Sequence, residues 1–309
     1  METKVFDLII IGGGPAGLTA GIYAVRAGLD TQLLEKLSPG GQVINSYEIE
    51  NYPGFAEPVP GWQLMAGMED QARRLGLPIE SAEVTALSKN GGIFNIESTG
   101  GSYAARSVII ASGAESRKLG VPGEKEFLGR GVSYCATCDG AFFKDKITAV
   151  VGGGDVALEE AHFLTRFSSR VYLVHRRDSF RGADILQKRI LGDEKIVPVL
   201  SSVVESINGE DKVNSVAVKD VKTGETRNLE TDGVFIFVGY DPITSYLDNS
   251  LLNEKGEVIV DMDMKTGIDG LFAAGDLRSG SKRQIVMAAA DGATASMGAY
   301  EYLSVISCT

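Results

Sequence analysis

Residues 133–140 read SYCATCDG and place two of the three cysteines three positions apart, with an aspartate directly behind them. In this Cys-x-x-Cys spacing, Cys135 and Cys138 can form a redox-active dithiol, half of a zinc site or a pair of buried structural thiols. A zinc site needs about four ligands, but the chain offers only two histidines and one further cysteine, Cys308. The spacing therefore favours a redox dithiol and leaves structural thiols as the alternative.

One strand–turn–helix–strand pattern occurs twice along the chain, at residues 7–36 and 147–176. Two parallel strands joined in this way need a crossover helix. A glycine turn ahead of that helix leaves room for a pyrophosphate at the helix N-terminus. We therefore predict two dinucleotide-binding units, with ligand-free tight turns as the alternative. The turn residues are Gly12, Gly14, Pro15, Ala16 and Gly17 in the first copy and Gly152, Gly154, Asp155, Val156 and Ala157 in the second.

The second strands of the two copies end in opposite charges. The first ends at Glu35, 35 − 12 = 23 residues after the first glycine, where a carboxylate accepts hydrogen bonds from an unphosphorylated ribose. The second ends in HRRDSFR, and guanidinium groups suit a ribose 2′-phosphate. The pattern predicts FAD in the first unit and NADPH in the second, unless the basic run is only a solvated strand end. The basic run supplies His175, Arg176, Arg177 and Arg181.

Short alternating strands with glycine turns follow each unit, at residues 86–107 and 203–230. We predict an α/β fold of two Rossmann-like, three-layer ββα dinucleotide-binding domains, each with a small antiparallel β excursion. Turn-rich connectors at 115–124 and 239–246 lead into and out of the second unit. The predicted FAD-binding domain is discontinuous and comprises residues 1–116 and 247–309. The predicted NADPH-binding domain comprises residues 117–246 and carries the Cys-x-x-Cys.

Charge and composition exclude several classes of protein. The chain has 309 residues, a formal net charge of −11 and a pI near 4.8, whereas nucleic-acid-binding proteins normally carry a basic footprint. No apolar run approaches the about 20 residues that a membrane span needs, and the N-terminus resembles a first strand more than a signal peptide. Three cysteines do not make a secreted disulfide framework. We expect a cytoplasmic protein that binds neither nucleic acid nor membranes.

Nine segments together resemble the low-molecular-weight thioredoxin reductases over essentially the whole chain. They are GGGPAG, LLEK, PGGQ, ENYPGF, SYCATCDGAFF, VVGGGD, EEA, HRRDSFR and GLFAAGDL, in the order and approximate spacing of that family. The resemblance implies an NADPH-dependent thioredoxin-disulfide reductase with FAD and NADPH as cofactors. Electrons would pass from NADPH through FAD to the Cys135–Cys138 disulfide and on to thioredoxin by thiol–disulfide exchange. It also implies a thioredoxin or thioredoxin-like partner and a homodimer.

The resemblance assigns further residues and a motion. Asp139 is implied as the acid that donates a proton to a cysteine sulfur when the disulfide is reduced. This role requires the pKa of Asp139 to be raised by burial. A helix over 291–303 is expected to point its positive N-terminal end toward the flavin. The NADPH-binding domain is expected to rotate about the two connectors during turnover. The residues implied at the FAD site, in addition to the first glycine turn and Glu35, are Gly41, Gln42, Asn51, Gly113, Asp276, Arg283 and Gln284.

Two other functions on the same scaffold remain open. One is a reductase that takes electrons from ferredoxin or from reduced flavin, and the other is a non-catalytic FAD-binding redox sensor. The glycine turn and arginine cluster of the second unit favour NADPH over the first of these. Val156 departs from the family pattern, because a small polar residue is common at that place. Cys308 has no nearby partner cysteine, so we interpret it as a tail thiol.

Overall fold

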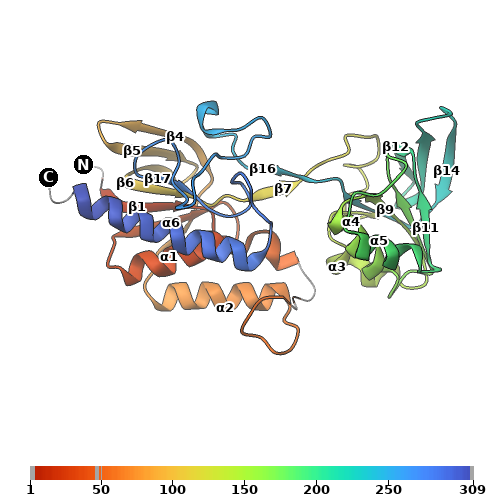
Figure 1. The fold of residues 1–309 in the computed structure, drawn as a ribbon, viewed down its shortest axis with the longest axis horizontal. Coiled ribbons are helices and arrows are strands. Elements are labelled where there is room, and N and C mark those ends of the chain that lie inside the picture. Colours follow the sequence, from red (N-terminus) through yellow and green to blue (C-terminus); the bar gives the residue numbers. More distant parts are fainter. Residues whose placement is uncertain (1–3, 46–48, 50, 307–309) are drawn as a thin grey trace. The chain divides into compact units, whose positions relative to one another are not determined.

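The computed structural model describes residues 4–45, 49 and 51–306 (Figure 1). The chain divides into two compact units, which we call unit 1 (residues 1–115 and 241–309) and unit 2 (residues 116–240). The two connectors between them pair with each other as a two-stranded sheet of β7 (Ala114–Ser116) and β16 (Tyr240–Pro242).

Unit 1 is a three-layer ββα domain. Its sheet has seven strands in the order β3-β2-β1-β6-β5-β4, with β17 also paired to β6. Three helices gather on one side of the parallel strands, and β4 and β5 lie on the other (Figure 1). The elements are β1 (Val5–Ile11), α1 (Pro15–Arg26), β2 (Thr31–Glu35), η1 (Gly41–Asn45), α2 (Gly61–Arg74), β3 (Ile79–Ser81), β4 (Val84–Asn90), β5 (Ile93–Ser98), β6 (Gly101–Ile110), η3 (Asn249–Leu251), β17 (Leu271–Ala273) and α6 (Ile285–Ile306).

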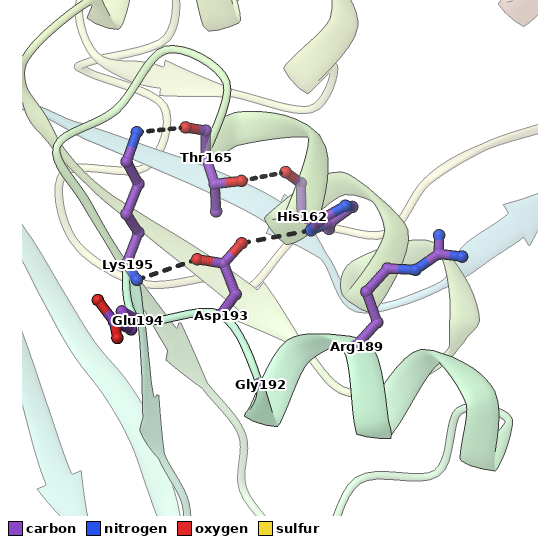
Figure 2. Close-up of a pocket in the computed structure, with 7 residues that line it drawn as sticks. All are labelled: His162, Thr165, Arg189, Gly192, Asp193, Glu194 and Lys195. Carbon is purple, nitrogen blue, oxygen red and sulfur yellow. Dashed lines mark hydrogen bonds and ion pairs between the residues drawn. The ribbon is translucent and has the colours of Figure 1, made fainter.

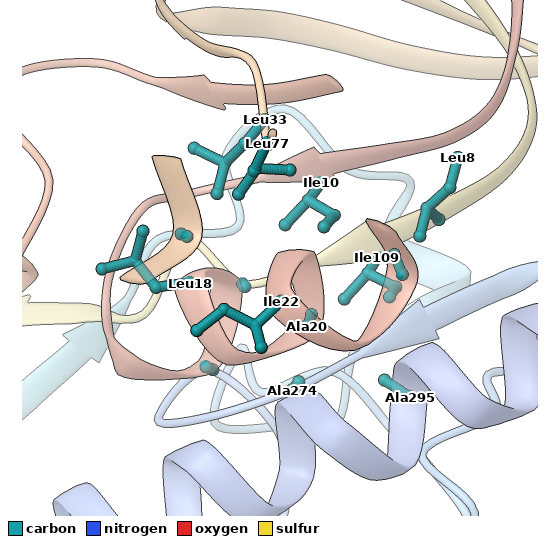
Figure 3. Close-up of a cluster of buried hydrophobic side chains, with 14 of the residues drawn as sticks. Leu8, Ile10, Leu18, Ala20, Ile22, Leu33, Leu77, Ile109, Ala274 and Ala295 are labelled. Atoms are coloured by element: carbon teal, nitrogen blue, oxygen red, sulfur yellow. The ribbon is translucent and has the colours of Figure 1, made fainter. Parts of the chain in front are cut away.

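Strand β1 is buried on both faces. Leu8 and Ile10 pack into the cluster formed with α1, α2 and α6, which Figure 3 shows. Ile9 and Ile11 pack into a second cluster that includes the antiparallel strands. Each such side chain contributes about 1.5–3 kcal/mol of stability when buried. A strand buried on both faces requires an unbroken apolar run, which the sequence LIII supplies.

Unit 2 repeats the same layers on a smaller scale. Its parallel sheet has the order β11-β10-β9-β15-β8, and a separate antiparallel sheet has the order β12-β13-β14. Buried residues of α4 and α5 pack on one face of the parallel sheet, and those of β12 and β13 on the other. The elements are β8 (Val132–Ser133), α3 (Ala136–Asp139), η2 (Gly140–Phe143), β9 (Ile147–Gly152), α4 (Asp155–Leu164), β10 (Arg170–Val174), α5 (Asp184–Leu191), β11 (Ile196–Val199), β12 (Ser202–Gly209), β13 (Val213–Asp220), β14 (Thr226–Glu230) and β15 (Gly233–Phe237).

The predicted fold class, two Rossmann-like domains with antiparallel excursions, is confirmed by these sheets. Two elements are longer than predicted. The short alternating strands were expected to end at residue 107, but β6 runs without a break from Gly101 to Ile110 because no glycine or proline interrupts YAARSVII. The helix expected over 291–303 begins at Ile285 and ends at Ile306, since residues 285–290 contain no glycine or proline. None of the helices in the described part of the chain combines the length and hydropathy of a membrane span.

The contact between α1 and α6 in unit 1 gives a first prediction. A Cβ added to Gly292 of α6 would lie 2.0 Å from the backbone oxygen of Ala16 in α1. Gly292→Ala should therefore force the two helices apart and cost about 1–3 kcal/mol of unfolding free energy. Urea unfolding followed by circular dichroism measures this cost.

Gly67 provides the matched control, because it also lies inside a helix but a Cβ there would meet nothing within 4 Å. Gly67→Ala should raise the unfolding free energy by about 0.5–1 kcal/mol. Equal stabilities of the two variants would contradict the packing described here.

Candidate functional site

The first glycine turn holds helix and strand of unit 1 in direct contact. Gly12 has a φ of +107°, and a Cβ at Gly17 would lie 1.8 Å from the Gly12 carbonyl oxygen. Gly14 precedes α1 as its N-cap without a side-chain cap, and Pro15 begins the helix. A Cβ at Gly14 would meet nothing within 4 Å. The turn therefore leaves open space in front of backbone N–H groups at a helix N-terminus, which suits an anionic group.

Glu35 lies at the end of β2 and folds back onto this turn. Its Oε2 accepts a hydrogen bond of 2.6 Å from the Gly13 amide, and its Oε1 accepts one of 2.9 Å from the Leu37 amide. Each carboxylate oxygen can accept more than one hydrogen bond. Glu35 is thus positioned beside the turn with acceptor capacity left for a hydroxyl group.

Other predicted residues of unit 1 gather near the same turn or pair with each other. Gly41 faces the turn, since a Cβ there would lie 3.3 Å from Gly14 Cα. Gln42 follows it in η1 and is exposed. Gly113 lies just past β6, where its carbonyl accepts a hydrogen bond of 3.0 Å from the Ile243 amide. Two distant segments meet where Asn51 Nδ2 donates to Gln284 Oε1 at 3.0 Å.

Asp276 follows β17 and lies on the path toward α6. Burial raises the pKa of its carboxyl above the ordinary value, while a hydrogen bond from Ser281 and the charge of Arg283 act in the opposite direction. Arg283 has a φ of +52°, and its Nη2 lies 3.6 Å from Glu257 Oε1. A half-buried carboxyl can accept a ligand hydroxyl in addition to the hydrogen bond from Ser281.

An ion pair beside Asp276 was missed by sequence reasoning. Asp291 of α6 accepts hydrogen bonds from Arg278 Nε at 2.7 Å and Arg278 Nη2 at 2.8 Å. Asp291 is buried and Arg278 is largely buried. Asp291 also accepts the Gly275 amide at 3.1 Å. The bidentate pair therefore ties the Asp276 turn to α6. The sequence signal was weak, because nothing local links positions 278 and 291.

The second glycine turn likewise holds helix and strands of unit 2 in close contact. A Cβ at Gly152 would lie 2.4 Å from the Phe237 carbonyl oxygen and 2.5 Å from Ala157 Cβ. Gly154 is the N-cap of α4, without a side-chain cap, and a Cβ there would meet nothing within 4 Å. Val156 in the first turn of α4 is 40% exposed. The space ahead of the helix is thus open, as in unit 1.

The basic run folds back onto this second turn. His175 is buried against Gly153, and its Nε2 is buried without a hydrogen-bond partner among the described residues. Burial, followed by the charges of the neighbouring arginines, lowers the pKa of His175. The Arg181 amide donates to the Gly153 carbonyl at 2.7 Å, and Asp155 Oδ1 accepts the Ala183 amide at 2.7 Å. The backbone of Arg181 is therefore held at the glycine turn.

Arg176 and Arg177 lie between His175 and Arg181 and are exposed. The structure thus brings the basic run and the second glycine turn to one edge of the unit 2 sheet. An unpartnered imidazole nitrogen and exposed guanidinium groups at that edge are suited to bind phosphate.

The cysteine motif lies just ahead of β9. Cys135 is half-buried and disulfide-bonded. Its amide donates to Ser133 Oγ at 3.0 Å, and its carbonyl accepts from that hydroxyl at 3.1 Å and from the Asp139 amide at 3.2 Å. Asp139 is half-buried at the end of α3. The backbone of Cys138 belongs to α3, but its side chain lies outside the described set, as does all of Cys308.

A pocket of about 490 Å³ opens at the other edge of unit 2 (Figure 2). It lies at the C-terminal ends of α4 and α5, where His162 Nδ1 is 3.4 Å from Asp193 Oδ2 and Lys195 Nζ donates to the Thr165 carbonyl at 2.7 Å. Helix N-termini, not C-termini, favour anions, so this pocket is no part of the dinucleotide site. Among the described residues, no group of three or more histidine, cysteine or acidic side chains could hold a metal ion.

Comparisons with known proteins agree with this arrangement. Residues 6–292 match the family model described as pyridine nucleotide-disulphide oxidoreductase. The chain is 46% identical to a thioredoxin reductase of Treponema pallidum, over 99% of each sequence, and 47% identical to one of Helicobacter pylori, over 97% of this chain and 99% of the other. The crystal structure of Lactococcus lactis thioredoxin reductase superposes with a TM-score of 0.90 at 44% identity, covering 97% of this chain and 99% of that one. These findings confirm the resemblance.

Glu160 of α4 gives a prediction for the pH dependence of stability. Its Oε2 is buried with no hydrogen-bond partner among the described residues. Burial, and then the charge of Glu159, raises the pKa of Glu160 from 4.5 to about 7. The folded state thus binds this proton more tightly than the unfolded state, so the stability it contributes is lost as the pH rises from about 4.5 through about 7.

Glu160→Gln should remove this loss. The variant should equal the wild type near pH 4.5 and exceed it by up to about 3 kcal/mol above pH 8, as measured by urea unfolding across that range. Glu194→Gln, which alters an exposed carboxylate, is the control and should follow the wild type. A Glu160→Gln profile parallel to the wild type would contradict the prediction.

Proposed function

The chain belongs to the pyridine nucleotide-disulphide oxidoreductase family, and we propose that it is an NADPH-dependent, FAD-containing thioredoxin-disulfide reductase. One observation carries the proposal. Cys135 is disulfide-bonded and sits in a Cys-x-x-Cys directly ahead of β9, the first strand of the second dinucleotide-binding pattern. The names of the relatives with 46% and 47% identity support thioredoxin as the partner.

Unit 1 is the proposed FAD-binding domain, predicted at 1–116 and 247–309, and unit 2 the proposed NADPH-binding domain, predicted at 117–246. The residues fit these groups, because open space lies in front of the helix N-terminus at both Gly14 and Gly154. Glu35 beside the first turn suits an unphosphorylated ribose. The orphaned Nε2 of His175 suits a phosphate oxygen in the second.

When bound, the nicotinamide and the flavin supply the hydride and electron transfer that reduces the disulfide. In unit 1, Asn51 and Gln284 orient each other through their hydrogen bond. Arg283 directly precedes Gln284, and both residues lie just before α6. Asp276 would accept a hydroxyl of the FAD. In unit 2, Arg176, Arg177 and Arg181 would bind the 2′-phosphate.

The exchange step belongs to the two cysteines. One thiolate of the reduced pair attacks a sulfur of the partner's disulfide, and the partner's S–S bond breaks as a mixed disulfide forms. The second thiolate then attacks the mixed disulfide, which closes Cys135–Cys138 and releases the partner as a dithiol. Asp139, one residue beyond Cys138, is the proposed proton donor to the cysteine sulfur that becomes a thiol when the Cys135–Cys138 disulfide is reduced.

The partner surface begins beside α3. Phe142 of η2 is 74% exposed, and an exposed aromatic ring next to a redox pair suits an apolar contact on a thioredoxin-like protein. The homodimer and the cytoplasmic location remain predictions. Helix α6 presents Met297, Tyr300 and Val305 to solvent, and a second copy of the chain would cover these side chains.

The first test of the function replaces each cysteine. Cys135→Ser and Cys138→Ser should each abolish NADPH-dependent reduction of thioredoxin, because one sulfur cannot close the intramolecular disulfide. NADPH should still bleach the flavin absorbance of both variants. The assay follows NADPH oxidation at 340 nm with thioredoxin as acceptor, and Cys308→Ser serves as the control that keeps full activity. Turnover by either active-site variant would disprove the proposed role of the pair.

The arginine cluster separates NADPH from the alternative donors. The double variant Arg176→Ala/Arg177→Ala should raise KM for NADPH by about tenfold or more and change KM for NADH far less, because charge-assisted contacts to the 2′-phosphate are lost. Stopped-flow reduction of the flavin at varied concentrations of NADPH and of NADH measures how the reaction depends on each cofactor.

Arg170→Ala, at the opposite end of β10, is the matched control and should behave as the wild type. A wild-type protein whose flavin is not reduced by NADPH would instead favour a ferredoxin- or flavin-dependent reductase.

A further inference from the structure

Glu124 is a buried carboxylate that the proposed reaction does not use. It is 6% exposed. Its Oε1 accepts hydrogen bonds from the Leu119 amide at 2.8 Å and from the Tyr134 hydroxyl at 2.6 Å, and its Oε2 accepts the Gly120 amide at 2.6 Å. The carboxylate therefore joins the turn at 119–120 to the segment that leads into the redox motif.

The charge states make this contact strong. Burial alone would raise the pKa of Glu124, but the hydrogen bonds from Tyr134 and from backbone amides lower it below the ordinary value. Burial and the hydrogen bond to Glu124 raise the pKa of Tyr134. A neutral phenol thus donates to an ionised carboxylate, and such charge-assisted bonds are about twice as strong as neutral ones.

Tyr134 is covalently next to Cys135 and is held on several sides. Lys118 Nζ lies 3.7 Å from the centroid of the Tyr134 ring, and the ring packs against the hydrophobic cluster of the unit 2 sheet. Ser133, on its other side, belongs to β8, which pairs with β15. The backbone that carries Cys135 is therefore anchored to the sheet through β8 and to residues 118–124 through the Tyr134 side chain.

We propose that Tyr134 is a positioning residue for the redox pair, whose hydrogen bond to Glu124 holds the Cys135 backbone where the disulfide closes. This role rests on the proposed function only in taking Cys138 as the partner of Cys135. Closing a disulfide requires the two Cα atoms to lie about 4.4–6.8 Å apart. A Cys135 already held in place loses little backbone freedom when the bond forms, so the tether favours the disulfide over the dithiol.

The experiment measures the dithiol–disulfide equilibrium of the FAD-loaded protein without thioredoxin. Protein is equilibrated anaerobically with dithiothreitol at defined ratios of reduced to oxidised form, so that each protein disulfide reduced consumes one reduced dithiothreitol. Acid quenching, alkylation and mass spectrometry of the peptides then give the fraction of Cys135 and Cys138 present as thiol. Tyr134→Phe keeps the ring and loses only the hydroxyl. In this variant half of the cysteine pair should be reduced at a ratio of reduced to oxidised dithiothreitol about fivefold lower than in the wild type.

Two further variants make the result decisive. Glu124→Asp withdraws the carboxylate by one methylene and should shift the midpoint in the same direction as Tyr134→Phe. Tyr172→Phe removes a tyrosine hydroxyl from β10 of the same unit and should leave the midpoint unchanged. A role limited to packing would lower the thermal stability of Tyr134→Phe and leave its midpoint in place.

Midpoints of Tyr134→Phe and Glu124→Asp within twofold of the wild type would overturn the inference. The outcome does not depend on the thioredoxin assay, because dithiothreitol alone reports the equilibrium of the pair. A chain that fails to reduce thioredoxin would refute the proposed function, while the shift in Tyr134→Phe would still decide the role of the tether.

Discussion

Close contact between helix and strand at each glycine turn is the constraint on which both units depend. A Cβ at Gly17 or at Gly152 would lie within 2.5 Å of an atom of the facing element, so larger residues would push α1 and α4 away from β1 and β9. With the contact in place, each helix N-terminus meets the carboxyl end of its strand. The residues that end the next strand, Glu35 and His175, then reach the same edge.

The two turns share a glycine N-cap and open space at the helix N-terminus but have different neighbours. Glu35 places a carboxylate against the first turn, whereas the chain beyond His175 places three arginines near the second. Opposite charges beside one shared geometry can divide two nucleotide cofactors between two units. The redox pair precedes β9 in the sequence of unit 2, so the proposed electron path ends in the unit that carries the arginines.

Much of this organisation could be predicted from the sequence because it is local. The apolar run of β1 and the glycine turns follow rules that act over a few residues, and the duplicated pattern exposed both units at once. Contacts between distant positions could not be predicted in this way. The Arg278–Asp291 ion pair, the Asn51–Gln284 hydrogen bond and the Tyr134–Glu124 tether join side chains from separate segments. The continuous course of β6 was also missed, since alternating and unbroken apolar patterns meet within one strand.

Strand β6 also makes the antiparallel strands of unit 1 harder to exchange than those of unit 2. It pairs with β5 through residues 101–105, with β1 through residues 104–110 and with β17 through residues 108–110. The antiparallel excursion of unit 1 therefore shares a strand with the parallel core. The β12-β13-β14 sheet of unit 2 is separate from the parallel sheet. Replacing the unit 2 hairpins with those of another protein would leave every parallel strand intact. The same exchange in unit 1 would cut through a central strand, so natural variation and protein engineering have more freedom in unit 2.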